Sequence, residues 1–486
     1  MRDVVIVGGG PVGMFLASLL AQRGLDVLVL EQRTRPSMRS RAIGIHPPLL
    51  AALDTIGVGA DLMARAVHIR VGEVYCDGRR LGRMSFEKAA EYPFVAALAQ
   101  YETEALLRAR FDALKPGGVQ GGVTVVAVHE RIDDRVVIET ADGSTIDARY
   151  VVAADGARSA VRQSARIGWR SLGRRETYLM ADFPVEGAAA DVGTTRPRTD
   201  GSVGARDVAS ATSSVPSDSV ETAVPSDSVQ TAVPSDLVQT AVPPNLVQTS
   251  VPSASPSLSA SVLPSTPTAS ASSPAPTVSP VNSTSASAVS STTAPVTSTI
   301  DETAVLYFER GGVVESFPLP GQRRRWVAMT DGLRTDAVAA DLADIIRSRT
   351  GVDLPPSADA PSPFVVQQHL ADRMVAGRVI LVGDAAHEVS PIGGQGMNLG
   401  WLDAVALAPA LEQAVRNPAA AEPALAAFDE RRRRAARMAA RQAGFNMAMG
   451  RPVTGIRLLA RNALVRVLAL PPARGIVARA FTMRWL

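Results

Sequence analysis

The amino-acid sequence predicts an α/β protein that combines a parallel sheet with an inserted antiparallel sheet and C-terminal helices. The parallel sheet is predicted because apolar runs at 3–7 and 27–30 flank a helical run over 12–23, with glycine-rich connections between them. Strand-like runs at 304–309 and 312–317 are joined by a short turn, which is typical of antiparallel pairing. The alanine-, leucine- and arginine-rich C-terminal tail has the periodicity of helices.

Composition and charge exclude several classes of function. The 486 residues include 50 basic and 47 acidic ones, a net charge of only +3, so the composition gives no evidence for a nucleic-acid partner and none is expected. Cys76 is the single cysteine, which rules out an intramolecular disulfide and a thiolate metal cage, and no metal is expected. The chain opens directly into the 3–7 strand and has no apolar run of the roughly 18–20 residues that span a bilayer. We therefore expect a cytoplasmic protein.

A segment over 186–300 differs from the rest in being dominated by Ser, Thr, Pro, Ala and Val. It contains a nine-residue repeat that starts at Val215, Val224, Val233 and, degraded, at Val242. With so few large side chains to bury, the segment cannot offset an ordering cost of about 1–2 kcal/mol per residue. It is predicted to be a disordered insertion. A tolerated loop expansion is favoured over a partner-binding arm.

A glycine motif in the first turn indicates dinucleotide binding. Gly8, Gly10 and Gly13 follow an apolar strand and lead into a helix, and Glu31 ends the next strand. In this context the first glycine permits a tight turn, the second lets the backbone approach a pyrophosphate, and the third lets helix and strand pack closely. The helix N-terminus supplies free N–H groups to the phosphates, and Glu31 is placed to accept ribose hydroxyls.

Two further motifs follow apolar strands later in the chain. Asp155 and Gly156 come after the run at 150–153, and Gly383 and Asp384 come after a buried strand. A second glycine-rich turn over 391–398 then leads into a helix. A carboxylate at a strand end can hold a hydroxyl group, and the N–H groups of such a turn can stabilise negative charge.

These motifs, in this order, resemble those of the FAD-dependent monooxygenases of the p-hydroxybenzoate hydroxylase type. The resemblance covers the chain outside 186–300. The segment from Ser40 to Pro47 is similar to the family loop whose arginine, here Arg41, contacts FAD, and Gln100 is similar to the glutamine beside the flavin. The cofactor-binding residues implied by the motifs and the resemblance are Gly8, Gly10, Pro11, Val12, Gly13, Glu31, Arg33, Arg41, Gln100, Asp155, Gly156, Gly383, Asp384, Pro391, Gly394, Gly396, Met397 and Asn398.

The resemblance also implies the reaction. FAD would be bound, NAD(P)H would dock transiently to reduce it, and the reduced flavin would react with O₂ to form a C4a-hydroperoxide that hydroxylates a small aromatic or polyketide-like substrate. A single GxGxxG fingerprint follows a strand, so NAD(P)H is expected to have no stable site of its own and to be guided by Arg41 or Arg162. No side-chain catalyst is predicted, and the resemblance implies that His46 and His387 are structural or lie next to FAD rather than acting as bases.

The chain is expected to divide into discontinuous parts. These are an FAD-binding domain (1–67, 100–168 and 365–430), a substrate domain (68–99, 169–185 and 301–364), the insertion (186–300) and a C-terminal helical region (431–486). The basic amphipathic helix at 456–468 is expected to pack onto the FAD-binding domain, with contact to an anionic membrane as the alternative. Arg431–Arg434 are expected to form a solvated helix face.

Two other functions fit the same motifs. One is a flavin-dependent reductase or dehydrogenase, similar to prenyl-chain reductases. The other is a degenerate flavoprotein that serves as a scaffold, against which the intact glycines and both aspartate motifs argue.

Overall fold

The computed structural model describes residues 1–37, 40, 42–86, 92–131, 135–185, 302–390, 395–471 and 473–483. The predicted insertion over 186–300 lies outside these residues. So do three of the predicted cofactor residues, Arg41, Pro391 and Gly394.

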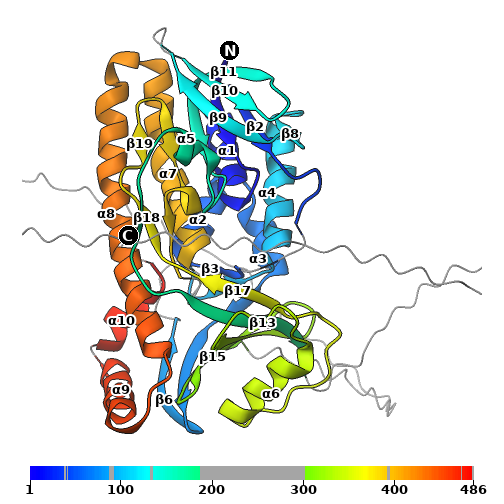
Figure 1. Ribbon diagram of the computed structural model, residues 1–486, viewed down its shortest axis with the longest axis vertical. Coiled ribbons are helices and arrows are strands. Elements are labelled where there is room, and N and C mark those ends of the chain that lie inside the picture. The colour runs from blue at the N-terminus through cyan, green and yellow to red at the C-terminus, as the bar shows by residue number, and fades with distance from the viewer. Residues whose placement is uncertain are drawn as a thin grey trace, which may run out of the picture. The chain divides into compact units, whose positions relative to one another are not determined.

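An eight-stranded sheet is built on the apolar strands near the N-terminus (Figure 1). Its central strands run parallel in the order β20-β11-β1-β2-β8, while β19 and the β9–β10 ribbon are antiparallel additions. The strands are β1 (Arg2–Val7), β2 (Val27–Glu31), β8 (Val119–Gly121), β9 (Val125–Glu130), β10 (Val136–Thr140), β11 (Thr145–Ala153), β19 (Val375–Ala376) and β20 (Val379–Leu381). Strands covered on both faces need continuous apolar runs like that of β1, and the predicted parallel sheet is confirmed.

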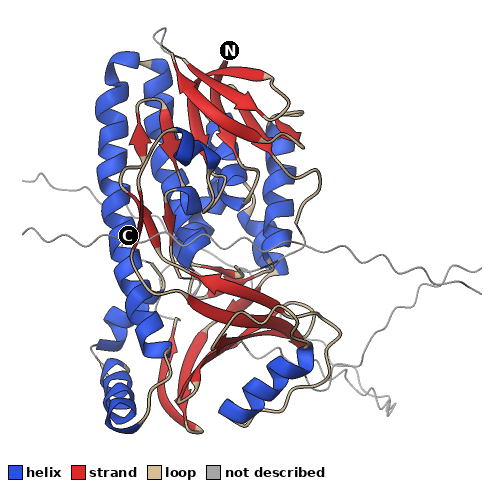
Figure 2. Ribbon diagram, viewed as in Figure 1, coloured by secondary structure: helices blue, strands red, loops and turns tan. Residues whose placement is uncertain are grey.

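Helices pack on this sheet and on one another (Figure 2). They are α1 (Pro11–Gln22), α2 (Pro47–Thr55), α3 (Gly59–Arg65), α4 (Gln100–Leu114), α5 (Ala160–Ser164) and α7 (Gln395–Arg416). Helix α1 starts at Pro11, where a missing N–H costs nothing because the first turn has no acceptor for it. It contacts α4 and α7, and Phe15 lies 5.8 Å from Trp401 between ring centroids. Residues far apart in sequence therefore share one core.

A seven-stranded sheet forms the second layer. Its order is β17-β13-β16-β15-β14-β5-β6, antiparallel except for the β14–β5 pair. The strands are β5 (Val71–Cys76), β6 (Arg79–Ser85), β13 (Glu176–Pro184), β14 (Thr303–Glu309), β15 (Gly312–Leu319), β16 (Arg323–Thr330) and β17 (Ser362–Val366). Helix α6 (Ala339–Thr350) packs on one face through Leu342 and Ile346. The expected antiparallel strands are confirmed, but parallel β5 makes the sheet mixed.

Two three-stranded sheets complete the described part of the chain. Their strands are β3 (Gly44–Ile45), β7 (Val95–Ala97) and β4 (Val67–Ile69) in one, and β12 (Trp169–Ser171), β18 (His369–Ala371) and β21 (His387–Glu388) in the other. The described residues belong to one compact unit. The division into an FAD-binding and a substrate domain therefore stays a prediction.

The C-terminal part is helical, as predicted: α8 (Ala421–Gly450), α9 (Gly455–Leu468) and α10 (Ala473–Phe481). Helix α8 lies alongside α7, and the predicted boundary at 430/431 falls inside it (Figure 1). Helix α9 packs on β6 of the seven-stranded sheet, so the expectation that it covers the FAD-binding domain is wrong. None of the described helices is long and apolar enough to cross a membrane.

Candidate functional site

The three motifs predicted from sequence meet at one sheet edge, because they follow the neighbouring parallel strands β1, β11 and β20. Gly8 has a φ of +110°, and a Cβ there would stand 2.3 Å from the carbonyl oxygen of Ala154. A Cβ on Gly13 would stand 2.0 Å from the carbonyl oxygen of Gly8. A Cβ on Gly10 would meet nothing within 4 Å. Gly8 and Gly13 thus allow backbone segments to approach closely where a side chain would not fit, whereas Gly10 borders open space.

Glu31, at the end of β2, closes one side of this turn. Its carboxylate accepts the Gly9 N–H at 2.7 Å and the Arg33 Nε–H at 2.8 Å. Burial raises the pKa of Glu31, but the hydrogen bonds from Arg33 and the Gly9 backbone outweigh it and leave the pKa below its ordinary value. The Arg33 N–H at 2.9 Å and Arg33 Nη2 at 3.4 Å also donate to Glu31, so four donors already meet the roughly four acceptor sites of an ionised carboxylate. A hydroxyl group at Glu31 would therefore replace one of these donors.

Asp155 lies at the end of β11, beside the first glycine turn. Its Oδ2 accepts the Val161 N–H at 3.4 Å, while its Oδ1 is buried with no hydrogen-bond partner among the described residues. Burial raises the pKa of Asp155 above its ordinary value, against the opposing hydrogen bond from Ser159. A buried acceptor without a hydrogen-bond partner costs free energy and is rare in folded proteins. The unpaired Oδ1 of Asp155 is therefore consistent with a site where a ligand supplies the donor.

The third motif contacts the first directly. A Cβ on Gly383 would lie 3.2 Å from Cγ2 of Val12, and one on Gly400 would lie 2.6 Å from the same atom. These glycines allow the start of α7 to approach the start of α1. Asp384 is exposed to the cavity described below, and a Cβ on Gly396 would lie 3.9 Å from its Oδ1.

Asn398 and Gln100 hold the segment 40–46 in place rather than pointing freely into the cavity. Asn398 accepts the His46 N–H at 2.9 Å and donates to the Gly44 carbonyl at 2.8 Å. Gln100 accepts the Ala42 N–H at 3.3 Å through Oε1. Both side chains therefore fix the backbone between Ala42 and His46.

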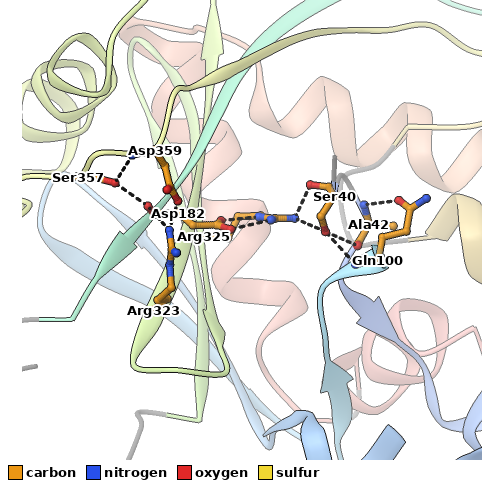
Figure 3. Close-up of polar contacts among 8 residues, drawn as sticks. All are labelled: Ser40, Ala42, Gln100, Asp182, Arg323, Arg325, Ser357 and Asp359. Carbon is orange, nitrogen blue, oxygen red and sulfur yellow. Dashed lines mark hydrogen bonds and ion pairs between the residues drawn. The ribbon is translucent and has the colours of Figure 1, made fainter. Parts of the chain in front are cut away.

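Arg325 on β16 connects this segment to the seven-stranded sheet (Figure 3). It donates from Nε and Nη2 to both carboxylate oxygens of Asp182, at 2.7 and 2.8 Å, and from Nη1 to the carbonyl of Ser40 at 2.8 Å. The Ser40 hydroxyl accepts the Gln100 N–H at 2.8 Å. Sequence reasoning did not single out Arg325, a residue that is only 4% exposed.

One cavity of about 980 Å³ runs from the glycine turn to the seven-stranded sheet. The predicted cofactor residues that line it are Gly8, Gly10, Pro11, Val12, Glu31, Arg33, Gln100, Asp155, Gly156, Asp384, Gly396 and Met397. Gly13, Gly383 and Asn398 lie behind this lining and serve packing and backbone placement. At the sheet end the lining is mainly apolar, with Glu315 as an acidic exception that was not predicted from the sequence.

His387 lies in a buried polar group outside the cavity lining. Its Nε2 is 2.6 Å from Oδ2 of Asp403, and the other Asp403 oxygen accepts from Nε of Arg432 at 2.7 Å. His387 and Asp403 are both 0% exposed. This agrees with the structural interpretation of His387. The expectation that Arg432 belongs to a solvated face is wrong, because Asp403 draws it into the core.

Arg162 is also buried, at 3% exposed. Its guanidinium donates to the carbonyls of Ala385 and Ala157 at 3.0 and 2.8 Å and stacks 3.8 Å over the Trp169 ring. A docking role for Arg162 toward NAD(P)H is therefore wrong, since its charge does not face solvent.

Comparison with known proteins identifies this arrangement. The family model of the FAD binding domain matches residues 1–232 and 270–443. The chain belongs to this family. As a member of the FAD binding domain family it carries a site for FAD, in agreement with the open space at Gly10 and the buried Asp155 oxygen.

Curated relatives match part of this FAD-binding chain. Rifampicin monooxygenase of Streptomyces venezuelae is 36% identical over 183 residues, which are 38% of this chain and 38% of that protein. The 6-methylpretetramide 4-monooxygenase of Streptomyces rimosus is 35% identical over 191 residues, 38% of this chain and 34% of that protein. The chain thus spans little more than a third of these relatives' lengths.

The fold is also found in solved structures. The p-nitrophenol 4-monooxygenase PnpA from Pseudomonas putida superposes with a TM-score of 0.67 at 20% identity, over 99% of this chain and 97% of that one. At this identity the likeness establishes the fold, and the predicted fold class is confirmed.

The role assigned to Asp384 can be tested by Asp384→Ala. If the Asp384 carboxylate accepts a ribityl hydroxyl, as predicted, its loss should weaken FAD binding by about 1.5–3 kcal/mol, the range for hydrogen bonds to charged groups. FAD affinity is measured by fluorescence titration of the apoprotein. The control is Asp372→Ala, which removes an exposed carboxylate that pairs with Arg170 outside the cavity and should leave FAD affinity unchanged. Equal affinities of both variants and wild type would contradict the role of Asp384.

Proposed function

We propose that this chain is an NAD(P)H-dependent FAD monooxygenase that inserts one oxygen atom of O₂ into a small aromatic or polyketide-like molecule. The observation that carries the proposal is the single cavity that joins a dinucleotide cradle to a mainly apolar chamber over the seven-stranded sheet. The shape of this cavity supports the proposal, because a dinucleotide bound at Gly8–Gly13 would extend toward the apolar chamber. The names of two relatives, rifampicin monooxygenase and 6-methylpretetramide 4-monooxygenase, support the same reaction class.

The chain's own residues would hold the cofactor and shape the chamber. The pyrophosphate would lie on the backbone from Gly8 to Gly13, with ribose hydroxyls at Glu31 and ribityl hydroxyls at Asp384. Gln100, Asn398 and Arg325 would fix the segment 40–46 that carries Arg41. When bound, FAD supplies the redox chemistry with NAD(P)H and O₂, and the protein orients the substrate and excludes water.

The experiment is turnover of the FAD-loaded protein with NADPH or NADH under isotopically labelled O₂. Rifampicin, para-nitrophenol and tetracycline precursors are suitable substrates because the relatives' names point to such molecules. We expect labelled oxygen in the product and O₂ uptake that depends on substrate. Substrate-dependent NAD(P)H consumption without labelled product would favour a reductase or dehydrogenase. FAD that neither nicotinamide reduces would favour a scaffold.

NAD(P)H is expected to bind weakly and transiently. Since Arg162 is buried, Arg41 remains the arginine proposed to guide it, and an exposed charge pair is screened within about 8–10 Å at ordinary ionic strength. Gel filtration in high salt should remove NAD(P)H while FAD remains bound, and adding substrate should speed flavin reduction. Stoichiometric NAD(P)H retained beside FAD would move the two-dinucleotide reductases ahead of the monooxygenase.

A further inference from the structure

The inner face of the seven-stranded sheet forms the apolar end of the cavity. Side chains alternate along a strand, so Val313, Glu315 and Phe317 of β15 share one face. In the sheet register Glu315 stands opposite Leu306 of β14 and Val327 of β16. Both neighbours line the cavity with Glu315, whereas α6 covers the opposite face.

Glu315 is an acidic residue on a strand face whose other side chains near it are apolar. Its side chain is 4% exposed, and Oε1 has no hydrogen-bond partner among the described residues. Burying a carboxyl group without a partner costs free energy, which a core position would avoid by using Val or Leu. The placement is explained if a ligand supplies the missing partner.

The charged neighbour on β16 does not neutralise Glu315. Arg325 is turned to Asp182, which it binds through two hydrogen bonds, and to the carbonyl of Ser40. On β14, Glu309 accepts the Asp77 N–H and lies outside the cavity lining.

The titratable neighbours on β13 and after α8 are paired as well. The Tyr178 hydroxyl donates to Oε2 of Glu176 at 3.0 Å, and the other Glu176 oxygen accepts from Nε of Arg451 at 2.6 Å. From α8 itself the cavity is lined by Phe445, Asn446 and Met449, which carry no charge. Burial alone therefore sets the titration of Glu315 and raises its pKa to about 8.

We propose that Glu315 receives the hydroxyl group of a phenolic substrate in this cavity and takes up its proton. This assignment rests on the proposed monooxygenase function and names the substrate class. The proton passes from the substrate oxygen to a carboxylate oxygen of Glu315, and the O–H bonding pair stays on the substrate as phenolate. The ring becomes richer in electrons, which favours attack on an electrophilic oxygen. A base whose proton affinity is raised toward neutral pH suits this task.

The test is the affinity of the FAD-loaded protein for para-cresol and for toluene, which differ by one hydroxyl. The para-cresol hydroxyl keeps its proton up to about pH 10, like that of tyrosine. At about pH 9, where Glu315 is ionised, we expect para-cresol to bind roughly 10- to 100-fold more tightly than toluene, as for hydrogen bonds to charged groups. At about pH 6 the ratio should fall to a few-fold, because a neutral carboxyl group makes the weaker bond.

Glu315→Gln keeps the shape but does not titrate, so its ratio should be a few-fold at both pH values. The matched control is Glu309→Gln, a buried carboxyl on the adjacent strand outside the cavity, which should keep the wild-type ratio. A wild-type ratio near one at high pH, or no binding of either probe, would overturn the proposal. So would a Glu315→Gln variant that retains the pH-dependent ratio.

A stability measurement would establish whether Glu315→Gln is folded and would test the titration of Glu315 separately. The folded state keeps the Glu315 proton up to about pH 8, while the unfolded chain loses it near 4.5. The free energy of unfolding of the wild type should therefore fall as pH rises between these values. The melting temperature of Glu315→Gln relative to that of the wild type should rise over the same pH range. A constant difference would contradict a buried, titrating Glu315.

The turnover experiment with labelled O₂ is interpreted separately from the para-cresol and toluene affinities. Labelled product with no preference for para-cresol would overturn the role of Glu315 alone. A pH-dependent preference in a protein that never inserts oxygen would overturn the proposed function and leave Glu315 as a hydroxyl-binding residue.

Discussion

Gly13→Ala is expected to lower both the stability of the fold and its affinity for FAD, whereas Gly10→Ala should lower the affinity for FAD alone. The added methyl at Gly13 would stand 2.0 Å from the Gly8 carbonyl oxygen, so α1 must shift away from the turn. Overpacking of this kind costs about 1–3 kcal/mol or more. The same shift moves the helix N-terminus away from the phosphates that it would bind.

At Gly10 the added methyl meets no protein atom within 4 Å and instead enters the space proposed for the pyrophosphate. The apoprotein should melt within a degree or two of wild type. Its FAD affinity should fall by at least about tenfold, which corresponds to 1.4 kcal/mol. Calorimetric melting of the apoprotein and titration with FAD separate the two effects.

The control is Gly475→Ala, which also adds a methyl to open space but at a position in α10 that does not line the cavity. It should bind FAD like wild type and gain slightly in stability, because alanine favours helix over glycine. If Gly10→Ala binds FAD as tightly as Gly475→Ala does, the pyrophosphate does not approach Gly10.

The parallel sheet and its glycine turn were predictable because local signals and tertiary packing agree there. The apolar run of β1, the helix start at Pro11 and the acid at Glu31 are each read within one βαβ unit. The later motifs at Asp155 and Asp384 were found for the same reason, since each follows an apolar strand. That they meet depends on the strand order β20-β11-β1, which the structure shows and which was not predicted from the sequence.

Residues whose roles depend on contacts distant in sequence were not predictable in the same way. Arg432 lies in a run of four arginines, and helical periodicity alone does not reveal that Asp403 lies opposite it. Arg162 resembles an exposed docking arginine until its contacts with Ala385 and Trp169 are seen. Glu315 did leave a signal, because an acid on the inward face of an alternating apolar strand is unusual. Identifying that face as the cavity side required the position of α6.

Asp403→Ala is expected to be among the most destabilising single changes in the described part of the chain. Asp403 is 0% exposed and accepts from Arg432 at 2.7 Å, from the Gly383 N–H at 3.0 Å and from His387 Nε2 at 2.6 Å. The positive charge of Arg432, 5% exposed, would lose its partner in the core. Breaking a buried ion pair by removing one member costs about 3–5 kcal/mol.

The two variants to compare by denaturant unfolding are Asp403→Ala and Glu430→Ala. Each removes the carboxylate partner of an arginine on α8, Arg432 in the first case and Arg434 in the second. Glu430 pairs with Arg434 at 2.7 Å, but both side chains are largely exposed, at 73% and 69%. An exposed pair of this kind contributes about 0.3–0.5 kcal/mol, so Glu430→Ala should stay close to wild type. Because Asp403 also holds the Gly383 N–H behind the cavity, Asp403→Ala should weaken FAD binding in the fraction that still folds. If Asp403→Ala lost FAD affinity without losing stability, Asp403 would have a direct role in the site. If its stability equalled that of Glu430→Ala, Arg432 would have found solvent or another partner.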